Sequence, residues 1–491
     1  MNQTDQRPPV LKWILVVGAR PNFMKVAPLI RAIKSFNQTN QTNYRNQKNQ
    51  INQTNQIDYL LIHTGQHYDY EMSQVFFQDL ELPRPDIYLG VGSGTHAEQT
   101  GKVMIEFEKV LFKEKPDLVI VVGDINSTLA CALTASKIDY SRDFKLKSQF
   151  DGVNSKQLLV SNKTNLINSI NPMNIKGNRP LIAHVEAGLR SFDRTMPEEI
   201  NRLVTDQISD FLFTPSPDAD ENLLKEGIPI KKIFLVGDIM IDSLLFNLEK
   251  AQKSQILEKL GLIRNPQSST RTPHSTISNQ QSAISIPNSA IRNPQSIMPY
   301  SLLTLHRPSN VDDRDAFLRI IQALTEISKH IPIIFPIHPR TRQRLEDFGL
   351  SNYFLYHDVN STNQTNQTNQ IDKTNETDQT NQIDQINLID PQGYLDFLNL
   401  MMHSKFVMTD SGGIQEETTA LGIPCLTFRD TTERPITITE GTNVLVHNNP
   451  KRIIEETNKI MTGKQKKGSC PSIWDGHTAE RIVNILAERR F

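Results

Sequence analysis

The stretch Met408-Thr409-Asp410-Ser411-Gly412-Gly413-Ile414-Gln415-Glu416-Glu417 carries more information about fold and function than any other part of the chain. It follows an apolar run, Phe406 to Met408, that predicts a buried strand, and it opens a short helix that ends near Gly422. Two glycines at a strand-to-helix turn let backbone amides approach an anion, and the amino end of a helix favours negative charge. A carboxylate one turn into the helix, at Glu417, can hold the hydroxyl pair of a ribose. The layout is that of a nucleotide diphosphate site, although an ordinary strand–glycine–helix turn has the same local pattern.

The overall composition fits a multidomain protein without a charge bias. The 491 residues exceed the usual size of one domain, and 53 Lys and Arg balance 54 Asp and Glu to a formal net charge of −1. Such a balance does not indicate a basic surface for binding nucleic acid or an anionic membrane. No apolar run reaches the roughly 18 residues needed to span a bilayer, and segment 1–9 lacks a signal-peptide core. The three widely spaced cysteines favour a reducing compartment, so we expect a cytoplasmic protein.

Four polar stretches interrupt the chain, at about residues 37–56, 141–177, 264–298 and 360–387. Asn-Gln-Thr repeats dominate the first and the last, and the third is rich in Ser, Asn, Gln and Pro. Such segments bury too little apolar surface to offset the entropy of ordering them, so we predict that they are disordered insertions. Long surface loops at these points cost little stability.

Apolar runs alternate with helical patterns along the remaining core. The predicted strands are Trp13–Val17, Tyr59–His63, Leu118–Val122, Leu181–Val185, Leu302–Leu305, Ile333–Ile337 and Phe406–Met408. Runs that are apolar throughout and separated by helices indicate parallel sheets covered on both faces. We therefore predict an α/β protein of two Rossmann-like domains that face each other across a cleft. The first domain covers residues 1–238 and is joined by a C-terminal helix, 474–491, while the second covers 239–473.

Polar residues gather directly after the predicted strands, where parallel α/β sheets bind their ligands. Most of them have a simpler alternative when taken alone. Asp124 can be a helix cap, Glu198 and Arg202 can form a surface pair at i,i+4 spacing, and Lys25 can lie on a solvated helix face. A single histidine, such as His306, is often structural. Because nearly every strand end carries a potential acid, base or phosphate ligand, we favour a catalytic site.

Taken in order, these segments resemble the non-hydrolysing UDP-N-acetylglucosamine 2-epimerase family, whose two-domain fold is shared with GT-B glycosyltransferases. The matching stretches are Gly18–Pro28, Gly65–His67, Gly123–Thr128, His184–Arg190, Pro197–Arg202, Thr304–Arg307, Thr409–Glu417 and Arg429–Pro435. They span the core from residue 13 to about 490 and leave out only the insertions.

The resemblance implies a role for individual residues, with UDP held mainly by the C-terminal domain. The residues implied to bind the nucleotide sugar are Arg20, Lys25, Gln392, Ser411, Gly412, Gly413, Glu417 and Arg434. Asp124, Glu186 and Glu198 match the acids implicated in proton transfer, and His306 matches the histidine associated with the leaving group. Gln66 and His338 match a neighbouring regulatory site of bacterial members. One departure falls near that site, because Arg307 is followed by Pro308-Ser309-Asn310 where many members carry a second Arg and a Glu.

Chemistry sets what these groups must do. The C2 proton of an N-acetylhexosamine is not beside a carbonyl, so its removal must accompany loss of UDP from C1. Cations and helix-end amides stabilise the departing diphosphate, and inversion at C2 asks for at least two proton-handling groups. The reaction needs no metal and no redox cofactor, and the sequence offers no ligand cluster for one. The leading hypothesis is reversible interconversion of UDP-N-acetylglucosamine and UDP-N-acetylmannosamine for polysaccharide biosynthesis, by the homodimer common in the family.

Other functions remain open at this level. The stretches Gly18–Pro21 and Gly65–Asp69 also resemble a sister epimerase of UDP-2,3-diacetamido-uronates, whereas Asp430–Pro435 favours the N-acetylglucosamine branch. A hydrolysing epimerase, a GT-B glycosyltransferase and a nucleotide-sugar-binding protein without turnover are the further alternatives.

Overall fold

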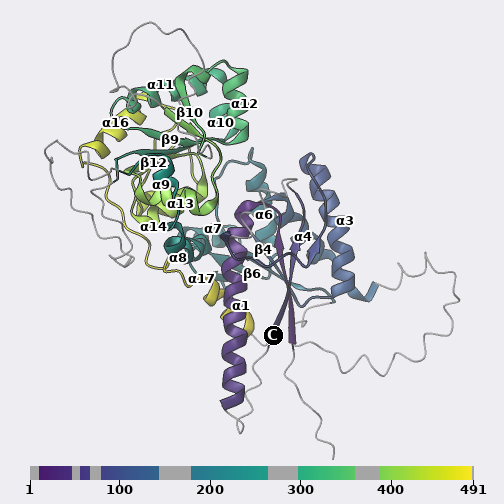
Figure 1. The fold of residues 1–491 in the computed structure, drawn as a ribbon. Coiled ribbons are helices and arrows are strands. Elements are labelled where there is room, and N and C mark those ends of the chain that lie inside the picture. The colour runs from purple at the N-terminus through teal and green to yellow at the C-terminus, as the bar shows by residue number, and fades with distance from the viewer. Residues whose placement is uncertain are drawn as a thin grey trace, which may run out of the picture. The chain divides into compact units, whose positions relative to one another are not determined.

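The computed structural model describes residues 10–46, 56–66, 79–142, 178–263, 297–359 and 386–488. The chain divides into two compact units, which we call the first unit (Met1–Ser243 with Ile473–Phe491) and the second unit (Leu244–Ser472). Each unit is built on one seven-stranded sheet, and the paired strands within each sheet are all parallel (Figure 1). The predicted α/β class with two Rossmann-like units is thus confirmed.

The sheet of the first unit has the strand order β3-β2-β1-β4-β5-β6-β7. The strands are β1 (Val10–Val17), β2 (Gln56–His63), β3 (Ile87–Tyr88), β4 (Leu118–Val122), β5 (Leu181–Val185), β6 (Phe211–Thr214) and β7 (Ile233–Leu235). The register places Trp13 of β1 opposite Tyr59 of β2 and Leu118 of β4. Strand order reverses between β1 and β4, and ligands of open α/β sheets bind beyond the strand ends at such a point.

Helices cover this sheet and bury their apolar faces against it. They are α1 (Arg20–Asn46), α3 (His96–Glu114), α4 (Asn126–Lys137), α6 (Pro197–Ile208), α7 (Pro217–Lys225) and α17 (Thr478–Glu488), with α8 (Ile239–Ala251) starting at the end of the unit. Two short 3₁₀ helices, Tyr140–Arg142 and Ile230–Lys232, complete the described elements. Ile14, Phe107, Val119 and Ile182 are fully buried in the core between α3, α4 and the strands.

Part of the first predicted insertion is wrong, because α1 continues through it to Asn46. The Asn37 side chain donates to the Ile57 carbonyl at 2.8 Å and accepts from the Ile57 amide at 3.0 Å, at the start of β2. Once a helix has formed, adding residues to it costs little, so a polar repeat with one anchored side chain can prolong it. Residues 47–55 and the bulk of the other three predicted insertions, 143–177, 264–296 and 360–385, lie outside the described residues.

The segment 474–488, which includes α17, packs on the first unit. The Trp474 indole donates to the Pro215 carbonyl at 2.9 Å, and Asp242 accepts from the amides of Thr478 and Ala479 at the start of α17. Helix α17 lies beside α1 (Figure 1). The carboxylate of Asp242 therefore caps the helix that returns to this unit.

The sheet of the second unit has the order β10-β11-β9-β8-β12-β13-β14. Its strands are β8 (Ser301–Thr304), β9 (Ile333–Pro336), β10 (Phe354–His357), β11 (Ile386–Ile389), β12 (Phe406–Thr409), β13 (Cys425–Thr427) and β14 (Asn443–Leu445). Strand order reverses between β8 and β12, so the segments that follow these two strands, far apart in sequence, emerge side by side.

The helices of the second unit include the one predicted from the opening stretch. They are α9 (Ile256–Lys259), α10 (Pro308–Val311), α11 (Arg314–Ser328), α12 (Pro339–Asp347), α13 (Tyr394–His403), α14 (Gly412–Leu421), α15 (Ile436–Thr439) and α16 (Pro450–Met461), with a 3₁₀ turn at Ser351–Tyr353. Gly422 ends α14 with φ 70°, a left-handed conformation that favours glycine, which confirms the predicted helix end. None of the described helices has the length and apolar character required to cross a membrane.

Candidate active site

A buried ion pair lies at the strand ends of the first unit. Lys25 of α1 donates from Nζ to Glu186 Oε2, and both side chains are buried. Gly123, directly after β4, has φ 66°, and a Cβ atom at this position would lie 2.8 Å from Lys25 Nζ. Glycine is thus required for the turn after β4 to approach the pair. The structure brings together Lys25 and Glu186, two residues that sequence reasoning placed in one site.

Glu186 has an unusual backbone for a residue with a side chain. Its φ is 69°, in the left-handed region, and residues held there are concentrated at functional sites. Two residues later Gly188 has φ 78°, and a Cβ there would lie 2.4 Å from the Ala219 carbonyl oxygen. The Oε1 atom of Glu186 is buried and has no hydrogen-bond partner among the described residues. A buried carboxylate oxygen without a donor is suited to receive a proton or a hydrogen bond from a ligand.

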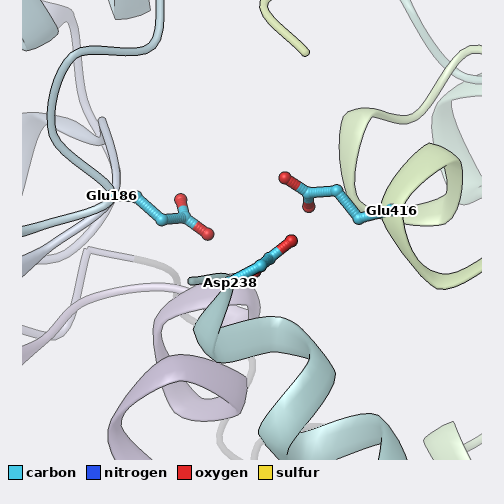
Figure 2. A group of neighbouring side chains, drawn as sticks. All are labelled: Glu186, Asp238 and Glu416. Carbon is cyan, nitrogen blue, oxygen red and sulfur yellow. The ribbon is translucent and has the colours of Figure 1, made fainter. Parts of the chain in front are cut away.

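A second buried carboxylate, Asp238, approaches Glu186 within the first unit. One oxygen of each group lies within 4.8 Å of the other, and Figure 2 shows both side chains, with Glu186 on the segment after β5 and Asp238 at the start of α8. Asp238 accepts from the Met240 amide at 2.8 Å. The figure also labels Glu416, which belongs to α14 of the second unit. Sequence reasoning missed Asp238 because it follows the short strand β7, which was not predicted.

Asp124 is held by a buried arginine and does not cap a helix. Helix α4 begins at Asn126 with Ile125 as its N-cap residue, while Asp124 Oδ2 accepts from Arg202 Nη1. Arg202 also donates to Glu199 Oε2 at 2.7 Å, so the alternative of a surface pair between Glu198 and Arg202 is wrong. Burial would raise the pKa of Glu199, but hydrogen bonds from Ser191 and the contact with Arg202 hold it below its usual range.

The remaining predicted residues of the first unit are Glu198, Arg20 and Gln66. Glu198 lies in the first turn of α6, partly exposed, at the helix end that favours negative charge. Arg20 is the first residue of α1, and its side chain is outside the described part of the structure. Gln66, in the segment after β2, is buried, and its Oε1 accepts from Ser127 Oγ at 2.7 Å and from the Ser127 amide at 3.3 Å.

A histidine and an aspartate meet where β8 and β12 end in the second unit. Asp410 is fully buried, and its Oδ2 accepts from the amides of His306 and Arg307 at 2.9 and 2.8 Å and from Asn310 Nδ2 at 3.0 Å. Its Oδ1 lies 2.9 Å from Nδ1 of the partly exposed His306 ring. Burial would raise the pKa of Asp410, but the contact with His306 and the amide donors hold it low. A carboxylate therefore faces Nδ1 and leaves Nε2 of His306 for a ligand.

The amino end of α14 has the features of an anion site. Ser411 is the N-cap residue, yet its side chain makes no capping hydrogen bond, so the hydroxyl is not used by the helix. A Cβ atom at Gly412 would lie 2.6 Å from Arg434 Nη1, which means that a larger residue would displace the guanidinium. Backbone amides, a hydroxyl and an arginine thus converge at the end of the helix that favours negative charge.

Further arginines surround this turn. Glu433 is buried between Arg434 (Nη1–Oε1 2.8 Å) and Arg429 (Nη2–Oε2 2.6 Å), while Arg307 Nη2 lies 3.7 Å from Oε1 and Arg434 Nε contacts Glu416 Oε1. Burial would raise the pKa of Glu433, yet Arg434 and Arg429 lower it far below its usual range. Three guanidinium groups against two carboxylates leave one positive charge, and Arg429 Nη1 is buried without a hydrogen-bond partner among the described residues. An anion such as a diphosphate would neutralise this positive charge and accept a hydrogen bond from Arg429 Nη1.

The remaining predicted residues lie on neighbouring elements of the second unit. Glu417, on α14, accepts from the buried Tyr394 hydroxyl at 2.9 Å, and burial together with Glu417 raises the pKa of Tyr394. Gln392 donates to the Asp390 carbonyl at 2.7 Å. His338 is the N-cap of α12, and its ring centroid lies 5.5 Å from that of His306.

Several of these groups were not singled out from the sequence. Asp410 stands inside the opening stretch, but its partner His306 is 104 residues away, and only the adjacency of β8 and β12 joins them. Asp206 is a similar case, because it contacts His184 at 2.6 Å across 22 residues. The spacing of Asp206 on α6 relative to Arg202 gave no signal of that contact.

The chain is similar to known proteins over almost its whole length. A family profile described as UDP-N-acetylglucosamine 2-epimerase matches residues 49–141 and 177–487. The UDP-N-acetylglucosamine 2-epimerase of Methanocaldococcus jannaschii is 36% identical over 98% of this chain and 100% of its own length. A UDP-2,3-diacetamido-2,3-dideoxy-D-glucuronate 2-epimerase of Pseudomonas aeruginosa is 33% identical over 97% of this chain and 100% of its own length. The crystal structure of the M. jannaschii UDP-GlcNAc 2-epimerase in complex with UDP-GlcNAc and UDP superimposes with a TM-score of 0.68 at 36% identity, covering 98% of this chain and 100% of that one. The chain belongs to the UDP-N-acetylglucosamine 2-epimerase family.

Proposed function

We propose that the protein reversibly interconverts UDP-N-acetylglucosamine and UDP-N-acetylmannosamine by eliminating UDP and adding it back. The single observation that carries the proposal is Glu186, a buried carboxylate with a partner-free oxygen, held at a strand end in a left-handed backbone. Such a group is suited to proton transfer. The substrate named for the 36% identical relative supports the same reaction.

The second unit would bind the UDP part. Ser411 and the amides of Gly412 and Gly413 would contact the diphosphate, with Arg434 beside them, while Glu417 would bind the ribose and Gln392 would lie in the same pocket. Arg429 supplies an unused buried nitrogen in the same cluster. These groups stabilise the negative charge that develops as UDP leaves. His306, positioned by Asp410, would donate a hydrogen bond or a proton to the departing phosphate.

The first unit would handle the C2 proton. A carboxylate removes the proton, the C–H electron pair forms the C1=C2 double bond, and the bond from C1 to the β-phosphate oxygen breaks. Delivery of a proton to the opposite face of C2, with return of the UDP oxygen to C1, gives the epimer. Asp124, Glu186 and Glu198 are the proposed acids and bases, and Lys25 and Arg20 complete the sugar pocket.

Incubation of the full chain with UDP-N-acetylglucosamine in deuterated water tests this proposal. We expect UDP-N-acetylmannosamine to form and C2 of both epimers to carry solvent deuterium, observed by proton NMR. Glu186→Gln removes the proton-accepting carboxylate and is expected to slow both processes about 10²–10⁴-fold. As a matched control, Glu249→Gln changes an exposed carboxylate on α8 and is expected to leave both rates unchanged. Absence of deuterium uptake by the wild type would refute the reaction.

A second substrate is favoured by one specific comparison. The P. aeruginosa relative named for UDP-2,3-diacetamido-2,3-dideoxy-D-glucuronate is 33% identical over nearly the whole chain. The same elimination chemistry would serve this sugar. Measuring kcat/KM for the two UDP-sugars side by side decides between them, and we expect the N-acetylglucosamine compound to be preferred.

We further propose a homodimer that works in the cytoplasm. Ile105 on α3 and Ile200 and Val204 on α6 are exposed apolar residues, and Phe192 before α6 is 77% exposed. Helices α3 and α6 both pack on α4, and exposed apolar groups gathered in one region are typical of a protein interface. Light scattering coupled to size-exclusion chromatography tests the dimer, with Ile200→Lys expected to give a monomer. Cell fractionation tests the location.

The predicted regulatory site is tested with Gln66→Ala and His338→Ala. If substrate activates the enzyme there, the wild type should show sigmoidal kinetics and the two variants should not.

A further inference from the structure

The side chain of His184 is completely buried between two hydrogen-bond acceptors. Nε2 lies 2.8 Å from the carbonyl oxygen of Gly123, and Nδ1 lies 2.6 Å from Oδ1 of Asp206. A carbonyl oxygen can only accept, so Nε2 must carry a proton. The charge state of the ring then depends on whether Asp206 is a carboxylate or a carboxylic acid.

The surroundings of Asp206 favour the carboxylate. Its other oxygen, Oδ2, accepts from the Gly188 amide at 3.1 Å and pairs with Arg190 Nη2 at 2.7 Å, so both oxygens face donors. Burial would raise the pKa of Asp206, but His184 and Arg190 hold it below its usual range. Arg190 is shared with Glu226, at 2.7 Å. With His184 doubly protonated, two positive and two negative groups balance in this cluster.

The same contacts tie down two of the proposed catalytic acids. Asp206 holds both ends of the turn that carries Glu186, through His184 before it and Gly188 after it. His184 in turn holds the Gly123 carbonyl, one residue before Asp124. The turn at Gly123 is also the point that lies against the Lys25–Glu186 pair, since a Cβ there would be 2.8 Å from Lys25 Nζ and 3.8 Å from Glu186 Oε2.

We propose that His184 is a positioning residue, whose ring donates from Nδ1 to Asp206 and from Nε2 to the Gly123 carbonyl and thereby fixes the Gly123–Asp124 turn relative to Glu186. The proposal rests on the proposed function for its catalytic consequence, because the distance between the two acids matters only if both serve one reaction. Arg190 pairs with Asp206 and with Glu226, while the Lys25–Glu186 pair lies against the Gly123 turn that His184 holds.

Nitrogen NMR of the folded protein, labelled with ¹⁵N-histidine, tests the charge state without any assay of activity. His184→Gln identifies the resonance by its loss, and Asp206→Asn identifies it by its shift if the first variant does not fold. Because both ring nitrogens face acceptors, we expect both to carry a proton in the folded protein. A resonance of an unprotonated ring nitrogen would overturn the proposal.

Kinetics of His184→Gln test the positioning role. Glutamine can donate to the Gly123 carbonyl but cannot also donate to Asp206, so the turn loses one anchor. We expect kcat to fall about 10- to 100-fold, with KM and the Kd for UDP changed less than about threefold, because small displacements of catalytic groups affect the chemical step. Ser209→Ala is the control, since it removes a buried hydrogen bond from the same helix end, from Ser209 Oγ to the Thr205 carbonyl, without touching the cluster.

The outcomes separate the two proposals. Equal kcat values for His184→Gln and Ser209→Ala would overturn the positioning role, as would a parallel loss of UDP binding. A wild-type protein that converts neither UDP-sugar would refute the proposed function, and the nitrogen spectrum would still decide whether His184 donates from both ring nitrogens.

Discussion

Replacing Asp410 with asparagine separates the chemical role of the His306–Asp410 contact from its structural role. In the wild type, Oδ2 of Asp410 accepts three hydrogen bonds and Oδ1 faces His306 Nδ1 at 2.9 Å. Asparagine has one oxygen, which must stay with the three donors, so its amide nitrogen turns toward His306. His306 Nδ1 then has to accept, and the ring cannot become an imidazolium without leaving this geometry.

The expected magnitudes follow from these contacts. Hydrogen bonds to a charged group contribute about 1.5–3 kcal/mol each and those to a neutral group about 1 kcal/mol, but relief of burying a charge offsets part of the loss. We therefore expect the free energy of unfolding of Asp410→Asn to fall by only about 1–3 kcal/mol. In contrast, a histidine held in the wrong protonation state loses most of its acid catalysis, so kcat should fall roughly 10²–10⁴-fold.

Three measurements check this prediction: initial rates with UDP-N-acetylglucosamine, calorimetric titration with UDP, and urea unfolding. The matched control is Asp313→Asn, because Asp313 caps α11 by accepting from the Ala316 amide at 2.7 Å and asparagine caps equally well. The control should keep its rate and stability. An Asp410→Asn protein with a rate within threefold of wild type would refute the reasoning, and so would one that loses UDP affinity as strongly as it loses kcat.

Three further predictions concern other parts of the structure. Gly188→Ala places a Cβ 2.4 Å from a backbone oxygen and should lower the free energy of unfolding in urea more than Gly227→Ala does. Gly227 also has a positive φ, but a Cβ there meets nothing within 4 Å. Equal losses of stability in the two variants would contradict the close contact at Gly188. The left-handed backbone alone accounts for roughly 1–3 kcal/mol in either variant. Folding lowers the pKa of Asp206, so the stability it contributes is present above pH 3.8, the ordinary pKa of an aspartate, and is lost as the pH falls through the pKa of the folded protein. The free energy of unfolding of Asp206→Asn should lie about 3–5 kcal/mol below that of wild type at pH 7, and the difference should shrink in acid. A difference that grows in acid would contradict this prediction. Arg429→Lys replaces the guanidinium, including the unused Nη1, by a single ammonium nitrogen and should weaken UDP binding about tenfold in calorimetry. Arg314→Lys, at an exposed site, should leave binding unchanged, and unchanged binding of the Arg429 variant would exclude Arg429 from the anion site.

The strand-to-helix turns were predictable because their signals are local. The bounds of β4 and β5 match the predicted strands, and α14 ends at Gly422 as the left-handed cap requires. Other predicted strands shift by a few residues at their ends. Strands such as β13 and β14, each of three residues, are too short to give a periodic signal and were missed.

Contacts between distant residues could not be predicted from spacing. His306 meets Asp410 because β8 and β12 pair. Arg202 contacts Asp124 because α6 packs on α4, the helix that follows Asp124. The helical extension of α1 to Asn46 was missed for a related reason. Its anchor is the Asn37–Ile57 contact, which composition cannot reveal.

The breaking of the bond between C1 and the phosphate oxygen is the central step of the proposed reaction. It is tested most directly with UDP-N-acetylglucosamine that carries ¹⁸O in this bridging position, followed by phosphorus NMR during turnover. Elimination frees the oxygen to exchange with the other oxygens of the β-phosphate, so we predict that the label appears in non-bridging positions of both epimers. If UDP-N-acetylmannosamine forms while all of the ¹⁸O stays in the bridge, UDP does not leave and the account is contradicted.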